Sequence, residues 1–299
     1  MPSSASTIGT GTFICPVGNH KFEATVYGSR FIYGQRPDGR PLETSRGYVS
    51  PPECPRNHLV LYRDFSSEEL TKLGIVIKTA EYRDMVKTET PFYRAAWLEQ
   101  AINPASADYV WLLLQATWYV NNDAERKERY RALFLSVAED MPVSTDNIGS
   151  LMLRLRVINT YRETGQFDRA ARELGKLPVE DLSHGLPDNA EDAYRLSDAD
   201  LSRWQFVTSA NQMKTLILRQ DGAVDPIDII PEWMIEEECY FRQPKSAFES
   251  AFCSTPELLQ KLADGKDYYE AQRPYYDYDG PILPTPPPPT RKPAISRPR

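Results

Sequence analysis

The sequence predicts an α+β protein in three parts: a small β-rich module over residues 1–65, a mainly α-helical domain over 66–265 and an extended tail over 266–299. Three observations support this division. Short runs of alternating apolar and polar residues fill the first part, longer runs with helical apolar spacing fill the second, and tyrosine and proline dominate the third. The length of 299 residues allows one large domain or two ordinary ones.

A cysteine and a histidine recur together on two short segments, residues 15–20 and 54–58, each with a proline after the cysteine. They use two of the four cysteines and two of the three histidines. A thiolate and an imidazole on one turn can bind a tetrahedral zinc ion, and two such turns supply the ligands of a closed structural site. Such a site leaves no open position for a substrate and indicates architecture. We therefore predict a structural zinc site formed by Cys15, His20, Cys54 and His58.

Short strands are predicted between and after these two turns. Residues 21–50 alternate apolar and polar positions and are interrupted by glycine and proline, as in strands joined by tight turns. The unit of Pro37, Asp38 and Gly39 is typical of such a turn, and residues 59–62 are predicted to form one more strand. A β module of about sixty residues has little core, so it would depend on the metal or on a neighbouring domain for stability.

Helices are predicted from residue 66 to about 220. The first begins at Ser66 or Ser67, because two glutamates follow these serines in the pattern of a helix start. Ser106 caps a later segment, and amphipathic spacing continues through residues 123–138, 148–161 and 201–219. Antiparallel helix pairs with short links are the expected arrangement.

One helix pair has an informative spacing, which is carried by Tyr161, Gly165, Phe167, Ala170 and Leu174. It is similar to the helix-turn-helix of a tetratricopeptide repeat, in which the glycine allows a tight turn and the alanine lets the helices approach closely. The pattern covers one repeat, and any amphipathic hairpin closed by a glycine has similar spacing. A repeat architecture and a single hairpin therefore both stay open.

The composition changes after Gly265. A short helix is predicted at residues 255–263, and the chain beyond it holds several tyrosines, four consecutive prolines and four basic residues near its end. Such a segment buries no core, so we expect polyproline II or no fold from about residue 268 onward. Residues 268–299 are predicted to bind a protein partner, together with the helical surface, or else to be a passive terminus.

Charge and cysteine content argue against two classes of protein, those that bind nucleic acid through their overall charge and those built on a disulfide framework. The net charge of −7 gives no overall attraction to nucleic acid. A local basic patch is nevertheless formed around the cysteine turns by Lys21, Arg30, Arg36, Arg40, Arg46 and Arg56.

Four cysteines are too few for a disulfide framework, which favours a reducing compartment such as the cytoplasm. The first residues do not resemble a signal peptide, and no apolar run approaches the roughly 20 residues that span a bilayer, so no membrane insertion is expected.

The N-terminal half, over residues 10–180, resembles an uncharacterised bacterial family, domain of unknown function 2225. The residues in corresponding places are Cys15, Pro16, Phe22, Ser29, Arg30, Asp38, Cys54, Pro55 and the hairpin at 161–174. The resemblance implies a zinc-ribbon-like module followed by tetratricopeptide-like helices, and it implies no particular activity. The family's other two turn cysteines would fall at Gly18 and Asn57, so either His20 and His58 replace them or the turns persist without metal.

No nucleophile elbow, phosphate loop, dinucleotide fingerprint or zinc-protease helix occurs in the sequence. His184 lies near two carboxylates, but its segment is typical of a solvated loop. The interpretation we favour is a non-enzymatic protein–protein interaction or scaffold protein with a structural zinc ion. Nucleic-acid binding through the basic β module is the first alternative, and an unrecognised enzyme is the second. The sequence leaves the partner and the oligomeric state open.

Overall fold

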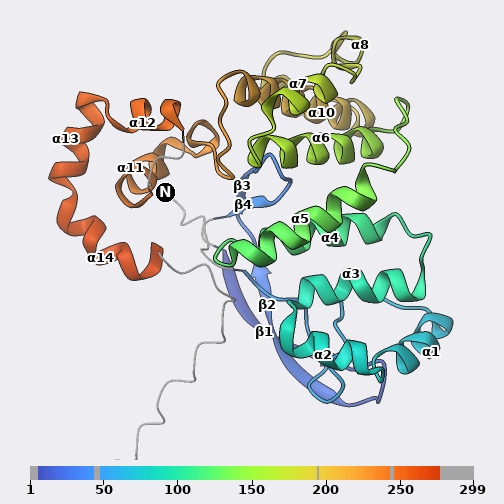
Figure 1. The fold of residues 1–299 in the computed structure, drawn as a ribbon. Coiled ribbons are helices and arrows are strands. Elements are labelled where there is room, and N and C mark those ends of the chain that lie inside the picture. Colours follow the sequence, from blue (N-terminus) through green and yellow to red (C-terminus); the bar gives the residue numbers. More distant parts are fainter. Residues whose placement is uncertain (1–5, 44–47, 194, 243–245, 277–299) are drawn as a thin grey trace, which may run out of the picture.

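A computed structural model describes residues 6–43, 48–193, 195–242 and 246–276, and Figure 1 shows their arrangement. Two small antiparallel sheets come first in the chain, and helices make up the rest. The α+β class predicted from the sequence is confirmed. The helices from α1 to α10 form a stack, the sheets lie along one side of it, and the last four helices form an arc beyond the sheets (Figure 1).

The β module consists of two hairpins. Strands β1 (Thr7–Ile14) and β2 (Lys21–Ser29) pair antiparallel, and β3 (Ile32–Gln35) pairs antiparallel with β4 (Pro41–Glu43). The sequence analysis did not anticipate β1, where two glycines interrupt the apolar pattern. It was wrong about a strand at residues 59–62, because only an isolated bridge joins Glu53 to Val60. The backbone there is engaged in a turn, since Leu59 donates its N–H to the Asn57 side chain.

The predicted helical region at 66–220 is confirmed. The helix start at Ser66 is a capping box, in which the serine hydroxyl and the Glu69 side chain each satisfy the other residue's backbone N–H. The helices are α1 (Ser67–Val76), α2 (Ala80–Thr88), α3 (Pro91–Ile102), α4 (Asp108–Trp118), α5 (Ala124–Ala138), α6 (Ile148–Glu163), α7 (Phe167–Leu174), α8 (Val179–Ser183), α9 (Ala190–Ala193) and α10 (Asp198–Leu218).

The α6–α7 pair has the predicted hairpin geometry. Gly165 lies at the turn with φ of +76°, a backbone conformation that glycine adopts without strain. Ala170 is fully buried where α7 approaches its neighbours, and α10 packs against both α6 and α7. The main core lies among α4, α5, α6, α7 and α10.

The C-terminal part differs from the prediction. The 3-10 turn η1 (Ile227–Ile229) leads to α11 (Glu232–Phe241), α12 (Ala247–Cys253), α13 (Pro256–Asp264) and α14 (Lys266–Tyr276). The tail was expected to have no fold from about residue 268, yet α14 is helical because Tyr269 is buried against α11. Its ring lies 4.8 Å from that of Tyr240, and its hydroxyl donates to Glu236 at 2.8 Å. The remainder of the predicted tail, residues 277–299, lies outside the described residues.

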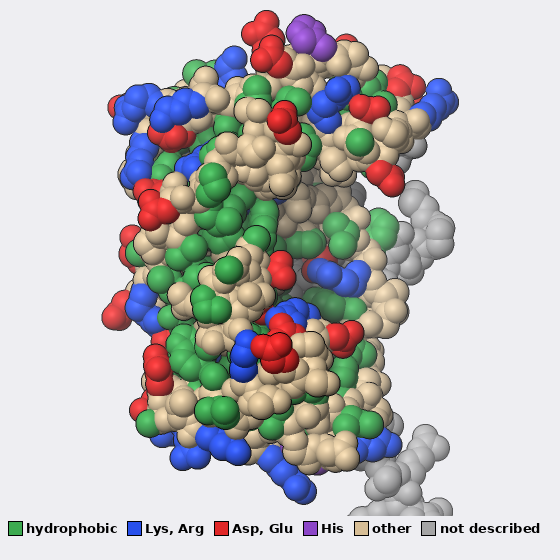
Figure 2. Space-filling view, turned by 90° about the vertical axis from the view of Figure 1, so that its right-hand side faces the viewer, with side chains coloured by type: hydrophobic (Ala, Val, Ile, Leu, Met, Phe, Trp, Pro, Cys, Tyr) green, Lys and Arg blue, Asp and Glu red, His purple; other side chains and the backbone are tan. Residues whose placement is uncertain are grey.

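The helical stack leaves hydrophobic side chains on its surface as well as in its core. On the face shown in Figure 2 they form patches between charged side chains, and the face is hollowed near its middle. Among the described residues, no helix combines the length and apolarity needed to cross a bilayer.

Candidate functional site

The two cysteine turns share the same pair of backbone hydrogen bonds. In the first, the Cys15 N–H donates to the carbonyl of His20, and the Asn19 N–H donates to the carbonyl of Cys15. In the second, Cys54 pairs in the same way with Leu59, and His58 donates to Cys54. Asn19 and His58 both have positive φ, at 49° and 59°. The two segments therefore share a hydrogen-bond pattern counted from the cysteine, although Gly18 has a positive φ of 105° and its counterpart Asn57 does not.

This register explains why the two histidines are not equivalent. Counting from each cysteine, His58 corresponds to Asn19, whereas His20 corresponds to Leu59. His58 is an exposed residue whose Nδ1 lies 2.6 Å from Glu53. The His20 Nε2 atom is buried and has no hydrogen-bond partner among the described residues. The histidines thus extend from different positions of their turns and have different surroundings.

The two cysteines are brought together. Cys15 and Cys54 form a disulfide, their Cα atoms are 5.6 Å apart, and both residues are fully buried. Asn57 lies beside them: its amide donates to the Val17 carbonyl at 2.6 Å, and its side-chain carbonyl accepts the N–H of Leu59. A Cβ atom added at Gly18 would lie 3.5 Å from His20 Nδ1 and 4.0 Å from the Asn57 amide. Positions 18 and 57, where the resembled family has cysteines, therefore both face this junction.

The zinc site stays a prediction. In the part of the chain that the structure describes, no three His, Cys, Asp or Glu side chains gather closely enough to hold a metal ion. The disulfide places two of the four predicted ligands side by side, and zinc binding needs them as thiolates. Metal loading would therefore require that Cys15 and Cys54 be reduced and that His58 leave Glu53.

The cysteine turns are attached to the first three helices. The fully buried Tyr82 of α2 donates its hydroxyl to the carbonyl of His58 at 2.6 Å. Arg94 of α3 donates to the same carbonyl and forms an ion pair with Glu53 at 2.7 Å. Cys15, Cys54, Leu59 and Val60 belong to one apolar cluster with residues of α1, α2 and α3. The turns thus share a core with α1–α3.

A second polar site forms where the β3–β4 turn meets the middle of α6. Arg156 is 4% exposed, and its guanidinium donates to the Pro37 carbonyl at 2.7 Å and to the Gln35 side chain. Gly39 has φ of +93°, and a Cβ atom there would lie 2.9 Å from Arg156 Nε, so only glycine lets the arginine lie against the turn. Burial lowers the pKa of Arg156 to about 10.

The same turn is anchored by two further arginines. Arg36 is buried and forms a bidentate ion pair with Asp225. Although burial opposes ionisation of Asp225, the charge and hydrogen bonds of Arg36 lower its pKa to about 2. Arg40 donates to the Trp118 carbonyl at the C-terminal end of α4. The turn therefore joins α4, α6 and the segment after α10.

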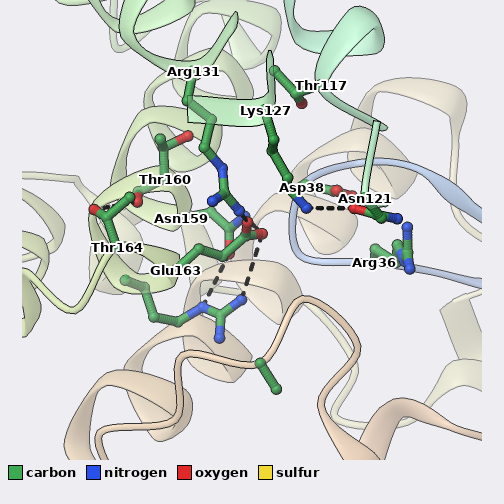
Figure 3. A network of polar contacts seen from close by, with 12 residues as sticks. Arg36, Asp38, Thr117, Asn121, Lys127, Arg131, Asn159, Thr160, Glu163 and Thr164 are labelled. Carbon is green, nitrogen blue, oxygen red and sulfur yellow. Dashed lines mark hydrogen bonds and ion pairs between the residues drawn. The ribbon is translucent and has the colours of Figure 1, made fainter. Parts of the chain in front are cut away.

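The network continues between α5 and α6 (Figure 3). Arg131 forms an ion pair with Glu163, and Asn159 donates to the same carboxylate at 2.7 Å while it accepts from Arg162. We call this set, together with Lys127, Asn121 and the residues around Arg36 and Arg156, the ionic network. Its members are Arg36, Asp38, Asn121, Lys127, Arg131, Arg156, Asn159, Arg162, Glu163 and Asp225.

Two groups of the ionic network have shifted pKa values. Lys127 extends from α5 toward Asp38 and Asn121 and donates to the latter (Figure 3). Burial lowers its pKa to about 8, with Arg131 acting in the same direction. Burial also raises the pKa of Asp38, although Arg36 opposes this. Such clusters occur at active sites and in structural ion-pair networks alike.

An apolar groove lies between α7, α8 and α10. It has a volume of about 490 Å³, and Leu174, Ala210 and Ile217 form its buried part. Glu180 and Lys214 lie at its edge, and Leu218 lines it with 76% of its surface exposed. An aliphatic side chain this exposed beside a groove is suited to contact another apolar surface.

The remaining residues predicted from sequence have ordinary places. His184 is exposed at the end of α8. Of the six predicted basic residues, Arg30 pairs with Glu43, Arg36 with Asp225, and Arg40 binds the end of α4; Arg46 lies outside the described residues. Cys239 and Cys253 form a second disulfide, so all four cysteines are paired, contrary to the expectation that the chain has too few of them for disulfides.

Sequence reasoning missed the ionic network. Its members come from segments more than a hundred residues apart, so no local pattern joins them. The available signal was Arg156 and Arg162, two of the three arginines of α6, which fall among its apolar residues. A charged residue at a helical core position needs a buried partner.

Comparisons with known proteins give no relative. No family model matches the chain, and no curated protein or solved structure matches it. The resemblance to domain of unknown function 2225 stays a prediction.

Proposed function

We propose that this chain is a non-enzymatic interaction or assembly protein, and that the groove between α7, α8 and α10 is its partner-binding surface. The observation that supports this most is Leu218, an aliphatic side chain with 76% exposure at the edge of an apolar groove. Exposed apolar surface beside a concavity is typical of binding sites.

The groove suggests the chemistry of its partner. Its floor accepts apolar side chains, while Glu180 and Lys214 offer one charge of each sign at the rim. An amphipathic segment with apolar anchors on one face and polar side chains on the other fits this arrangement. Leu218 would pack against the outer anchor and take the role of a hot-spot residue.

A pair of matched variants tests the proposal. Leu218→Glu introduces a charge at the groove, and Ile75→Glu introduces one at an equally exposed position of α1, where 68% of the isoleucine is exposed. Surface changes of this kind leave stability within about 0.5 kcal/mol. Intact tagged protein and both variants are used to recover partners from the source organism, and each candidate partner is then purified and titrated.

We expect a purified partner that binds the unmodified chain and Ile75→Glu alike, and binds Leu218→Glu about tenfold more weakly, the loss typical of a hot-spot contact. Equal affinity for all three chains would contradict the groove as the binding surface.

For the cysteine turns we propose a structural role in which zinc replaces the disulfide once the cysteines are reduced. The support is the shared junction of Cys15 and Cys54 and the buried His20 Nε2, which has no hydrogen-bond partner in the described part of the chain. Reduced protein should then bind one zinc ion per chain by elemental analysis, and Cys15→Ser should bind none. If the reduced chain does not retain zinc on dialysis, the zinc proposal is wrong and the two turns are held by the disulfide alone.

Nucleic-acid binding receives less support. Three of the six basic residues that suggested it are engaged within the chain, with Glu43, Asp225 and the Trp118 carbonyl. A continuous basic stripe requires unengaged side chains.

A further inference from the structure

The C-terminal helices contain a second groove, between α11 and α13. It has a volume of about 570 Å³, and its apolar lining is Ile235, Phe252 and Leu258. Three carboxylates lie around it, from Glu232, Glu236 and Glu257, against one lysine, Lys261. We call it the acidic groove.

Lys261 does not neutralise this rim. Its ammonium lies 3.5 Å from Glu236 and 3.8 Å from Glu257, so one positive charge is shared between two carboxylates. Glu257 has 85% of its side chain exposed and Glu232 is also exposed. The acidic groove thus offers an apolar floor and a surplus of accessible negative charge, which suits a cationic segment with an apolar anchor.

The chain itself contains such a segment. Residues 291–299 hold four basic residues, Arg291, Lys292, Arg297 and Arg299, and no acidic ones, and Ile295 lies in the middle. The sign of its charge complements the acidic groove, and Ile295 supplies an apolar anchor.

The position of α14 brings this segment within reach. Tyr269 of α14 hydrogen-bonds to Glu236, a lining residue of the acidic groove. From Tyr269 to the end of α14 the helix rises about 10 Å. The fifteen residues from 277 to 291 can then extend by about 46 Å even in the stiff polyproline II conformation. Since the path back to the groove is a fraction of this length, the tether favours the same chain over a separate molecule.

We propose that residues 291–299 bind the acidic groove between α11 and α13 of the same chain, with Ile295 on its apolar floor and the basic residues at Glu232 and Glu257. This contact is independent of the groove between α7, α8 and α10, and a partner of like chemistry would have to displace the segment.

Cross-linking in the full-length chain tests this. A photoreactive amino acid replaces Ala294, beside the anchor, and the cross-linked peptides are mapped after irradiation. We expect cross-links to residues of α11 and α13. The double variant Glu232→Lys and Glu257→Lys should lower their yield about tenfold, the change produced by losing two exposed ion pairs. Adding Lys292→Glu and Arg297→Glu should restore it, and Glu125→Lys, a charge reversal at another exposed position, on α5, should leave the yield of the unmodified chain unchanged.

A mixture of isotopically heavy and light protein distinguishes the occupants. Cross-links within one isotope support the same chain, whereas mixed cross-links would show a second copy and overturn the proposal. Cross-links outside α11–α13, or none, would overturn it as well. A cross-linking yield that does not change with the charge reversals would also overturn the proposal, because it would exclude recognition by charge.

Discussion

The β module is attached to the helices in two different ways. Its cysteine turns are closed by the Cys15–Cys54 disulfide and share an apolar core with α1–α3. Its β3–β4 turn, in contrast, is held on α4, on α6 and on the segment after α10 by arginines, of which Arg36 and Arg156 are buried. One attachment is covalent and apolar, and the other is ionic. We therefore expect reduction to affect the attachment of the cysteine turns to the helices, and a change of pH to affect the attachment of the β3–β4 turn.

The largest effect is expected at the ionic attachment. Arg36→Met leaves the carboxylate of Asp225 without its partner, and breaking a buried pair in this way costs about 3 to 5 kcal/mol of unfolding free energy. Urea unfolding of the intact chain measures it. Arg36→Met combined with Asp225→Leu should recover part of the loss. If the unfolding free energy of Arg36→Met lies within about 0.5 kcal/mol of that of the unmodified chain, the ionic attachment contributes little to stability.

The covalent attachment should contribute slightly less. The two cysteines are 39 residues apart, and a cross-link over such a loop stabilises by about 2 to 4 kcal/mol. Cys15→Ser with Cys54→Ser should therefore lower the urea midpoint under oxidising conditions and have no such effect in excess reductant. The same loss of stability in both conditions would show that it comes from altered packing of the serine side chains and not from loss of the disulfide bond.

The stability contributed by the α6–α7 hairpin should not depend on reductant. Ala170 is fully buried, and Ala170→Leu overpacks its site at a cost of about 1 to 3 kcal/mol. We expect the same loss with and without reductant. Ala171→Leu is the control, since Ala171 is exposed. Equal stability of the two variants would contradict the close contact at Ala170.

The smallest effect concerns pH. The pKa of Lys127 is lowered to about 8 from an unfolded value of 10.5, so the unfolded chain binds the proton more tightly. The buried lysine therefore lowers the unfolding free energy by its full amount below pH 8, and this loss disappears as the pH rises toward 10.5. Unfolding free energy of the unmodified chain minus that of Lys127→Met should therefore rise between pH 8 and 9.5. A flat difference would indicate a lysine that stays solvated.

The sequence could predict what is local. Ser66 with Glu69 marks a helix start, and Gly165 with Ala170 marks a hairpin, because caps and tight turns are formed by neighbours in the chain. The pairing of Cys15 with Cys54 was partly predictable, since the repeated turns indicated that the two cysteines converge. The surroundings of His20 and His58 were not predictable, because the Glu53 partner of His58 and the burial of His20 Nε2 depend on packing around the turns.

Long-range ionic contacts were beyond the sequence. Arg156 and Pro37 are 119 positions apart, and Arg36 and Asp225 are 189 apart. Charged residues are abundant in the chain, and only the fold selects which of them are buried together. The helix α14 was missed for a similar reason: its tyrosines suit a disordered tail as well as a helix, and only the contact of Tyr269 with α11 decides between them.

The Cys15–Cys54 bond also has a mechanical consequence. Tension applied at β1 passes through the bond directly to α1–α3 and bypasses the 39-residue loop that holds the other three strands. While the bond is intact, about 130 Å of chain cannot be drawn out, and the β3–β4 turn stays unloaded on α6. Once it is reduced, the same pull would pass along the loop toward the β3–β4 turn, so the disulfide keeps tension away from the ionic network.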